Sequence, residues 1–199
     1  MKNLIKIFLI ISLGFSSVFA LNKDEIKPKM AEKIDNVLVI LGKKELTNDQ
    51  KGEQIIKIID EVFDYNLMAM LSLGKQTWVS INSQQRAEFT ELFEEKLKKS
   101  YIDKLKLYND QKVKIIGLKD HQGSRAQLQT ELLGKDKTYQ INYNFYENRK
   151  DKQWYIYDVD LVGVSIIKTY QLQFNGQLKE KTFDELLEEL KDSLANETK

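Results

Sequence analysis

The spacing of apolar residues changes twice along the chain, and this change constrains the fold more than any other feature. From residue 22 to residue 107 apolar residues recur every three or four positions, which is the period of an amphipathic helix. Between residues 113 and 162 they alternate with polar residues, as in a strand with one buried face. From residue 164 the helical period returns. The sequence therefore predicts an α+β fold, with helices before and after a sheet.

Helix-capping patterns divide the N-terminal helical region. Gly74 follows the short, almost wholly apolar stretch 67–73 and is expected to end a helix there. Asn82 and Gln85 stand three residues apart, as in a capping box, before an apolar stripe that continues to Tyr108. We expect this stripe to belong to one long helix that lies across the concave face of the sheet.

Four stretches of alternating residues predict four strands, joined by short polar turns into an antiparallel meander. The clearest is the third, in which tyrosine, isoleucine and phenylalanine alternate with glutamine and asparagine. In the fourth, alternation places Tyr155 and Tyr157 on the buried face together with Val159. The four stretches are 113–118, 125–133, 139–145 and 153–162.

The first twenty residues have the pattern of a secretory signal peptide. Lys2 and Lys6 precede the apolar stretch 7–19, and Ala20 stands at the expected cleavage position. We therefore expect export to the periplasm. The remainder, 21–199, is expected to form a single domain with helices over about 22–108, the sheet over about 112–163 and helices over about 164–195.

The charged residues nearly cancel, with 31 basic and 30 acidic side chains and a formal net charge of +1. This balance argues against nucleic acid as a partner, because such binding requires clustered positive charge. The chain has no cysteine and one histidine, His121, which excludes disulfides, thiol catalysis and cysteine or histidine metal clusters. No metal ion and no cofactor are expected.

Two carboxylates keep an enzymatic alternative open. Asp158 and Asp160 share one face of the fourth strand, and Tyr139 and Tyr143 lie on the neighbouring strand. A carboxylate base with a tyrosine in an apolar pocket is the arrangement of some isomerases and dehydratases. Alternation, however, puts both carboxylates opposite the apolar face, which favours a role outside catalysis. A plain periplasmic interaction module is a further alternative.

Apolar residues gather on three predicted elements: the helix at 67–73, the long helix and the inward face of the sheet. Two interpretations remain open at this point. The residues fill one another as an ordinary core, or they wall a cavity for an apolar ligand beneath the twisted sheet. The candidate wall residues are Met70, Leu71, Leu73, Phe93, Leu97, Tyr101, Val113, Ile115, Leu128, Ile141, Tyr143, Phe145, Tyr157, Val159, Leu161, Val164 and Ile167.

Motifs along almost the whole chain resemble those of the MlaC, or toluene-tolerance, family. They lie at residues 64–66, 73–78, 84–89, 154–159, 163–167 and 170–175. The resemblance implies a nuclear-transport-factor-2-like cone, made of a four-stranded antiparallel sheet covered by a long helix, with a helical subdomain. It also implies a protein without catalytic activity that binds a diacyl phospholipid by its tails.

The same resemblance implies two protein partners in lipid transport. These are an outer-membrane lipoprotein complex and an inner-membrane transporter of the ABC type with its substrate-binding subunit. The chain itself is expected to be a monomer. One position departs from the family pattern, because Gln171 stands where an arginine usually follows the tyrosine of the last motif. We therefore expect no cationic contact there.

Transfer of a lipid requires the protein to open, and glycine accepts large backbone changes without strain. Gly74 and Gly163 lie at expected boundaries between elements. We expect them to act as hinges.

Overall fold

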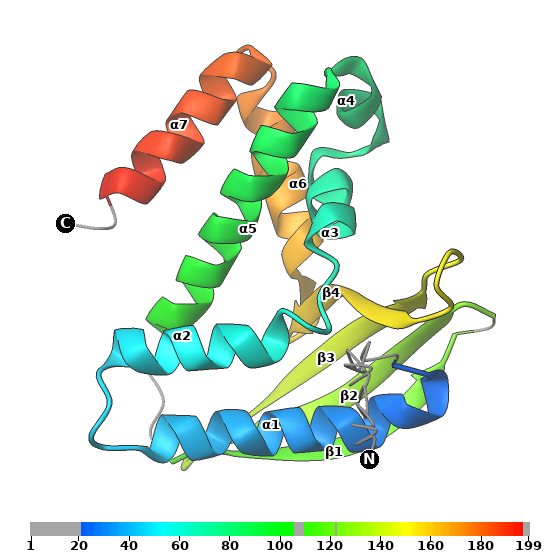
Figure 1. The fold of residues 1–199 in the computed structure, drawn as a ribbon, viewed down its shortest axis with the longest axis vertical. Coiled ribbons are helices and arrows are strands. Elements are labelled where there is room, and N and C mark those ends of the chain that lie inside the picture. Colours follow the sequence, from blue (N-terminus) through cyan, green and yellow to red (C-terminus); the bar gives the residue numbers. More distant parts are fainter. Residues whose placement is uncertain (1–20, 106–109, 122, 197–199) are drawn as a thin grey trace, which may run out of the picture.

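The two ends of the molecule are built differently (Figure 1). The sheet and the first two helices occupy one end, and the remaining helices occupy the other. The computed structural model describes residues 21–105, 110–121 and 123–196, and the expected signal peptide lies outside this range.

Two helices accompany the sheet. After the short 3₁₀ helix η1 (Lys23–Glu25), helix α1 (Ile26–Gly42) runs beside the sheet, and α2 (Asn48–Ile59) returns along α1. Thr47 caps α2, because its hydroxyl accepts a hydrogen bond from the backbone N–H of Gln50.

The other end contains α3 (Tyr65–Leu73), α4 (Lys75–Ser80), α5 (Ser83–Leu105), α6 (Ile166–Gln177) and α7 (Phe183–Asn196). Their shared core is tightly filled by apolar side chains with almost no exposed surface. The rings of Phe89 and Phe174 meet edge to face at 5.3 Å, and those of Phe93 and Tyr170 at 5.2 Å. The capping box predicted at Asn82 is confirmed by two backbone to side-chain hydrogen bonds.

Helix α4 has no counterpart among the predicted elements. It is only six residues long, and Arg86 of α5 closes its end. The Arg86 guanidinium donates from Nε to the Trp78 carbonyl at 2.8 Å and from Nη2 to the Ile81 carbonyl at 2.9 Å. Because this support comes from another helix, the local pattern of residues 75–80 could not reveal it.

The sheet confirms the predicted α+β class and the antiparallel order. Strands β1 (Lys112–Asp120), β2 (Arg125–Leu133), β3 (Thr138–Glu147) and β4 (Trp154–Leu161) follow one another in space as in sequence. A fifth strand of two residues, β5 (Val164–Ser165), extends the sheet beyond β4.

The helix that packs on the sheet is α1 and not the long helix that we expected there. Ile26 and Met30 of α1 belong to the apolar cluster that contains Leu128 and Phe145 of the sheet. The buried residues of α5, by contrast, pack against α3, α6 and α7. The helical period showed that α5 has an apolar face, but it did not specify which element covers that face.

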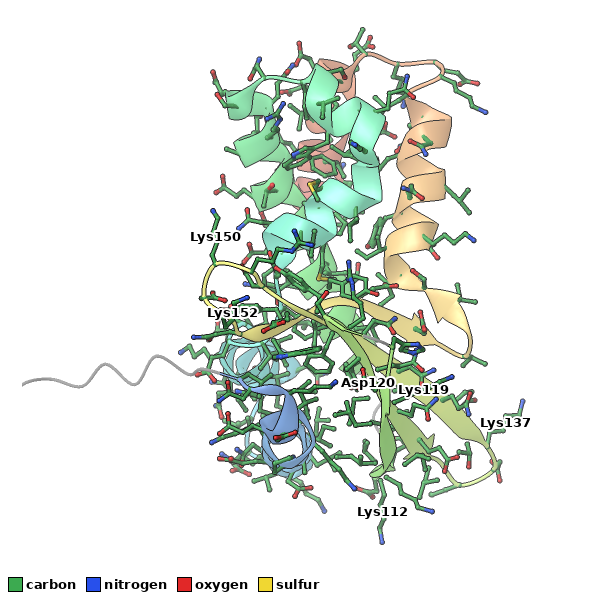
Figure 2. All side chains as sticks on the ribbon, turned by 90° about the vertical axis from the view of Figure 1, so that its right-hand side faces the viewer. Lys112, Lys119, Asp120, Lys137, Lys150 and Lys152 are labelled. Carbon is green, nitrogen blue, oxygen red and sulfur yellow. The ribbon has the colours of Figure 1, made fainter. Side chains whose placement is uncertain are left out.

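Strand β1 forms one edge of the described sheet. A bulge between Ile115 and Gly117 interrupts its pairing with β2. Lysines project from the ends and hairpins of the sheet, including Lys112, Lys137 and Lys150 (Figure 2).

Asp158 is buried on β4, and its carboxylate fixes the start of α6. Oδ1 accepts hydrogen bonds from the backbone N–H groups of Val159 at 2.8 Å and Ile167 at 3.1 Å. Oδ2 accepts from the Ser165 hydroxyl at 2.7 Å, and Ser165 in turn caps α6 through the Lys168 N–H. Burial raises the pKa of Asp158, although these hydrogen bonds oppose the increase.

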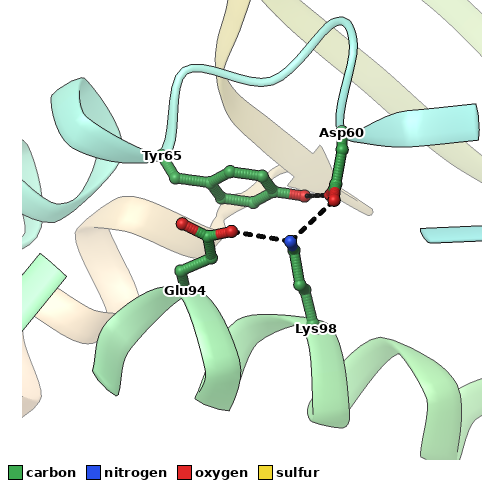
Figure 3. Close-up of polar contacts among 4 residues, drawn as sticks. All are labelled: Asp60, Tyr65, Glu94 and Lys98. Carbon is green, nitrogen blue, oxygen red and sulfur yellow. Dashed lines mark hydrogen bonds and ion pairs between the residues drawn. The ribbon is translucent and has the colours of Figure 1, made fainter. Parts of the chain in front are cut away.

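Lys98 joins the linker 60–64, between α2 and α3, to the long helix α5 (Figure 3). Its Nζ donates to Asp60 at 2.8 Å and to Glu94 at 2.6 Å, and it lies 4.8 Å from the centre of the Tyr65 ring. The Tyr65 hydroxyl donates to Asp60 at 2.9 Å. Burial disfavours the charge on Lys98, but the hydrogen bonds to Asp60 and Glu94 outweigh it and raise the pKa of Lys98.

Replacement of Asp158 by Asn should change how stability depends on pH. The pKa of Asp158 is raised in the folded protein. The contribution of this carboxyl group to the free energy of unfolding is therefore greatest at low pH, and it is lost as pH rises above about 4. We expect the free energy of unfolding of Asp158→Asn, relative to wild type, to increase between pH 4 and pH 7 in urea titrations. Asp160→Asn, on the same strand, controls for the loss of a carboxylate. A constant difference between Asp158→Asn and wild type would contradict the prediction.

Replacement of Lys98 by Met should lower the free energy of unfolding by about 1–2 kcal/mol, because two carboxylates lose their shared cation. Lys191→Met is the matched control, since Lys191 also joins two carboxylates, Glu88 and Glu188, but at the exposed surface between α5 and α7. Its loss should be smaller in the same chemical denaturation experiment. Equal losses would show that Lys98 is an ordinary surface lysine.

Candidate functional site

The sheet has one apolar face, and the register of its strands shows which side chains share it. Directly opposed residues of antiparallel strands point to the same side. Tyr143 of β3 stands between Leu128 of β2 and Val159 of β4, and the next row places Ile141 beside Leu161. Seven of the predicted wall residues meet on this face: Ile115, Leu128, Ile141, Tyr143, Phe145, Val159 and Leu161.

A bulge in β4 makes the predicted inward and outward positions wrong for the first part of that strand. Asn144 pairs with Asp158 whereas Phe145 pairs with Ile156, so Tyr157 is an extra residue. Its ring lies on the opposite side of the sheet, 4.2 Å from the Arg125 guanidinium carbon. Tyr157 is therefore not on the apolar face.

Tyr155 also lies on the outer side of the sheet, 6.4 Å from Tyr146 between ring centroids. The bulge reverses the alternation before residue 157, so Trp154 and Ile156 take the inward positions and are buried in the sheet cluster. Simple alternation missed these two residues. The only sequence signal for them was their apolar character, because the bulge itself has no clear signature.

The apolar face is packed unevenly. Phe145 and Ile156 are fully buried at one end. Toward the other end Ile115, Ile141 and Leu161 pack against the cluster but remain only half-buried. Helices α1 and α2 run beside this end of the sheet (Figures 1 and 2) and carry further half-buried residues, namely Val37, Leu38, Ile58 and Ile59.

Tyr143 shows that accessible space reaches the interior at this point. Protein atoms crowd around it, and burial raises its pKa to about 12. Its side chain nevertheless keeps accessible surface and is only half-buried. Accessible space therefore reaches Tyr143 on the apolar face.

Val113, half-buried on β1, pairs with Leu132 and extends the apolar face beyond Ile115. Most of the other predicted wall residues lie elsewhere. Leu73, Phe93, Leu97 and Ile167 are buried in the core of the helical end, where Leu71 packs against them. Met70 is half-buried on α3, whereas Val164 on β5 is 59% exposed. The side chain of Tyr101 lies outside the described residues. Among the side chains that the structure describes, those of the long helix and those of the sheet therefore do not wall one space, as we had expected.

Both proposed hinge glycines have positive φ. Gly74 joins α3 to α4 with φ of 79°, and Gly163 lies in the tight turn between β4 and β5 with φ of 81°. This backbone region explains the choice of glycine at each position.

Gln171, at the position of the usual family arginine, has a structural contact. Its Nε2 donates a hydrogen bond to the Leu71 carbonyl at 3.1 Å, so this carbonyl in the last turn of α3 has a partner. The side chain connects α6 to α3.

A separate polar hollow of about 270 Å³ lies at the surface where linker 60–64 meets α5 and the hairpin between β3 and β4. Asp64 on its wall is already engaged: its Oδ1 caps α3 through the Leu67 N–H at 2.9 Å, and its Oδ2 accepts from the Tyr146 hydroxyl. The other lining residues are Phe63, Tyr65, Asn66, Glu94, Asn148 and Tyr155.

One of the two carboxylates on which the enzymatic alternative rests, Asp158, holds the start of α6. Asp158 is occupied by three hydrogen bonds at the start of α6, on the side of the sheet away from Tyr143. It is therefore not placed to act on a ligand at the apolar face. Among the described residues no group of acidic or histidine side chains could hold a metal ion.

None of the described helices within residues 21–196 combines the length and the apolar character needed to cross a bilayer.

Comparison with known proteins agrees with this architecture. The fold is similar to the structure of a phospholipid-binding protein from Ralstonia solanacearum in complex with a phospholipid, with a TM-score of 0.74 and 19% sequence identity over 86% of this chain and 98% of that one. None of the curated proteins compared with the sequence matches it.

The sequence also matches a family model, described as MlaC protein, over residues 31–192. Members of this family are periplasmic lipid-binding proteins without enzymatic activity. Because the match extends over most of the sequence, from α1 to α7, the chain belongs to the MlaC family.

Proposed function

We propose that this protein binds a diacyl phospholipid by its acyl tails and carries it through the periplasm between membrane complexes. The main support for this proposal is that Tyr143, in the middle of the apolar face of the sheet, keeps accessible surface. Helices α1 and α2 lie beside this sheet. The similar protein from Ralstonia solanacearum was solved with a phospholipid, which supports the same class of ligand here.

The hydrophobic effect explains why such a carrier needs apolar walls. A diacyl lipid has about 30 methylenes, each contributing about 0.8 kcal/mol on burial, or roughly 25 kcal/mol in total. A lipid that left the bilayer without comparable shielding would return to it. The half-buried residues of the apolar face, such as Ile115, Ile141 and Leu161, provide surface of this kind.

The head group requires no charged site in this proposal. The side chains directly beside Tyr143 on the neighbouring strands, Leu128 and Val159, are apolar. The tails provide the binding energy, and the head group remains in water. The balanced charge of the chain suits this arrangement.

The proposed route follows from family membership and from the N-terminal sequence. Export by a cleaved signal peptide of residues 1–20 delivers the chain to the periplasm. There it exchanges lipid with an outer-membrane lipoprotein complex and with the substrate-binding subunit of an inner-membrane ABC-type transporter. Support for these partners comes from the family alone.

A bulkier side chain on the apolar face should expel the lipid. We expect native mass spectrometry of the purified wild-type protein to show a co-purified phospholipid, and Ile141→Trp to reduce the lipid-bound fraction by about tenfold by filling the accessible space at this face. Val79→Trp is the control, because Val79 is exposed on α4 at the other end of the molecule. A wild-type protein free of lipid would refute the carrier function and favour an interaction module.

Stiffening of the hinge glycines should slow lipid transfer. Alanine at Gly74 or Gly163 disfavours the positive φ, and at Gly74 the added Cβ would lie 3.3 Å from Gln171 Nε2. We expect each variant to transfer fluorescent phospholipid between vesicles several-fold more slowly than wild type. Gly176→Ala on α6 is the control, since nothing lies within 4 Å of its added Cβ. Unchanged rates in both Gly74→Ala and Gly163→Ala would rule out the hinges.

A further inference from the structure

The Tyr143 hydroxyl differs from those of several other tyrosines in the protein. Tyr65 donates to Asp60, Tyr146 to Asp64, and Tyr155 to Asp151. The Tyr143 hydroxyl, by contrast, donates to none of the described residues, and burial is the only influence on its acidity. Among the described residues, the Tyr143 hydroxyl is also not one of the fully buried polar atoms that lack a hydrogen-bond partner. The hydroxyl therefore faces accessible space deep in the molecule.

The surroundings of Tyr143 restrict what can reach this hydroxyl. Leu128 and Val159 stand directly beside it on the neighbouring strands, and Ile141 and Phe145 lie two residues away on the same face of its own strand. A charged phosphate or carboxylate would have to be buried among these apolar groups without a cation, which is strongly unfavourable. A neutral acceptor attached to a hydrocarbon chain meets no such penalty.

Thr130 carries another hydroxyl on the apolar face, but it is already satisfied. Its Oγ1 donates to the Ile141 carbonyl of the neighbouring strand at 2.7 Å, and the residue is buried. Tyr139 also belongs to this face, but it is 44% exposed at the outer end of β3. Tyr143 is thus the available hydroxyl donor among the half-buried and buried residues described on this face.

An ester carbonyl is the neutral acceptor that a phospholipid places next to its acyl chains. We propose that Tyr143 Oη donates a hydrogen bond to an ester carbonyl oxygen of the bound lipid, so that this residue selects acyl esters over alkyl ethers. The proposal rests on the proposed lipid-binding function and names the part of the ligand that this site recognises.

The test compares two probes that differ only in this linkage. Wild-type protein is equilibrated with vesicles containing equal amounts of dioleoyl phosphatidylcholine and its di-O-oleyl ether analogue, and the bound lipids are quantified by mass spectrometry. A neutral hydrogen bond corresponds to about a fivefold to tenfold preference for the ester. Tyr143→Phe removes only the hydroxyl, and we expect its preference to fall to nearly one.

Tyr157→Phe is the matched control, because Tyr157 lies on the outer side of the same sheet beside Arg125. It should keep the wild-type preference. Equal uptake of both lipids by wild type, or a preserved preference in Tyr143→Phe, would overturn the role of Tyr143 while lipid binding stands. Uptake of neither probe by wild type would instead refute the carrier function.

A measurement on the wild-type complex avoids dependence on the folding of Tyr143→Phe. The infrared carbonyl band of bound lipid labelled with carbon-13 at both esters should shift to lower frequency than in hydrocarbon, as expected for a hydrogen-bonded carbonyl. An unshifted band would contradict the proposal, whatever the behaviour of the variant.

Discussion

The extra residue of β4 at Tyr157 reverses the order of inward and outward side chains midway along the strand. Before the bulge Trp154 and Ile156 point inward, and after it Val159 and Leu161 do so. The whole strand can thus contribute to one apolar face although its sequence changes phase. The bulge also turns Asp158 toward the backbone at the start of α6, where it accepts hydrogen bonds from the following helix. The apolar face and the entry into the helical end therefore both depend on this irregularity.

The sequence-based predictions succeeded where local periodicity determines structure. The strands, their antiparallel order and the capping box before α5 all follow from patterns of a few residues. The predictions failed where the answer depended on distant segments. The partner of α5, the support of α4 by Arg86 and the bulge at Tyr157 are set by tertiary contacts that no short window contains.

The two ends of the molecule use apolar residues in different ways. In the helical end Phe89, Phe93 and Phe174 fill the space between helices and leave almost no exposed surface. On the sheet the side chains toward one end are close-packed, whereas Ile141 and Tyr143 are only half-buried. The sequence alone could not separate these cases, because a filled core and the wall of a hollow use the same residue types. Phe93 and Leu97, the described candidates from the long helix, consequently lie in the packed core. The candidates from β2 and β3, with Val159 and Leu161 of β4, share the face that borders accessible space.

The two margins of the sheet also differ in how they are closed. Backbone groups of β4 are engaged by Leu21, by Val62 and Asp64 of linker 60–64, and by the short β5. Strand β1, at the opposite margin, instead bears the bulge beside Gly117 and the outward Lys112 (Figure 2). A kinked and positively charged margin is a poor template for a strand from another molecule. This margin thereby protects the protein from edge-to-edge aggregation when no ligand covers the half-buried apolar surface of the sheet.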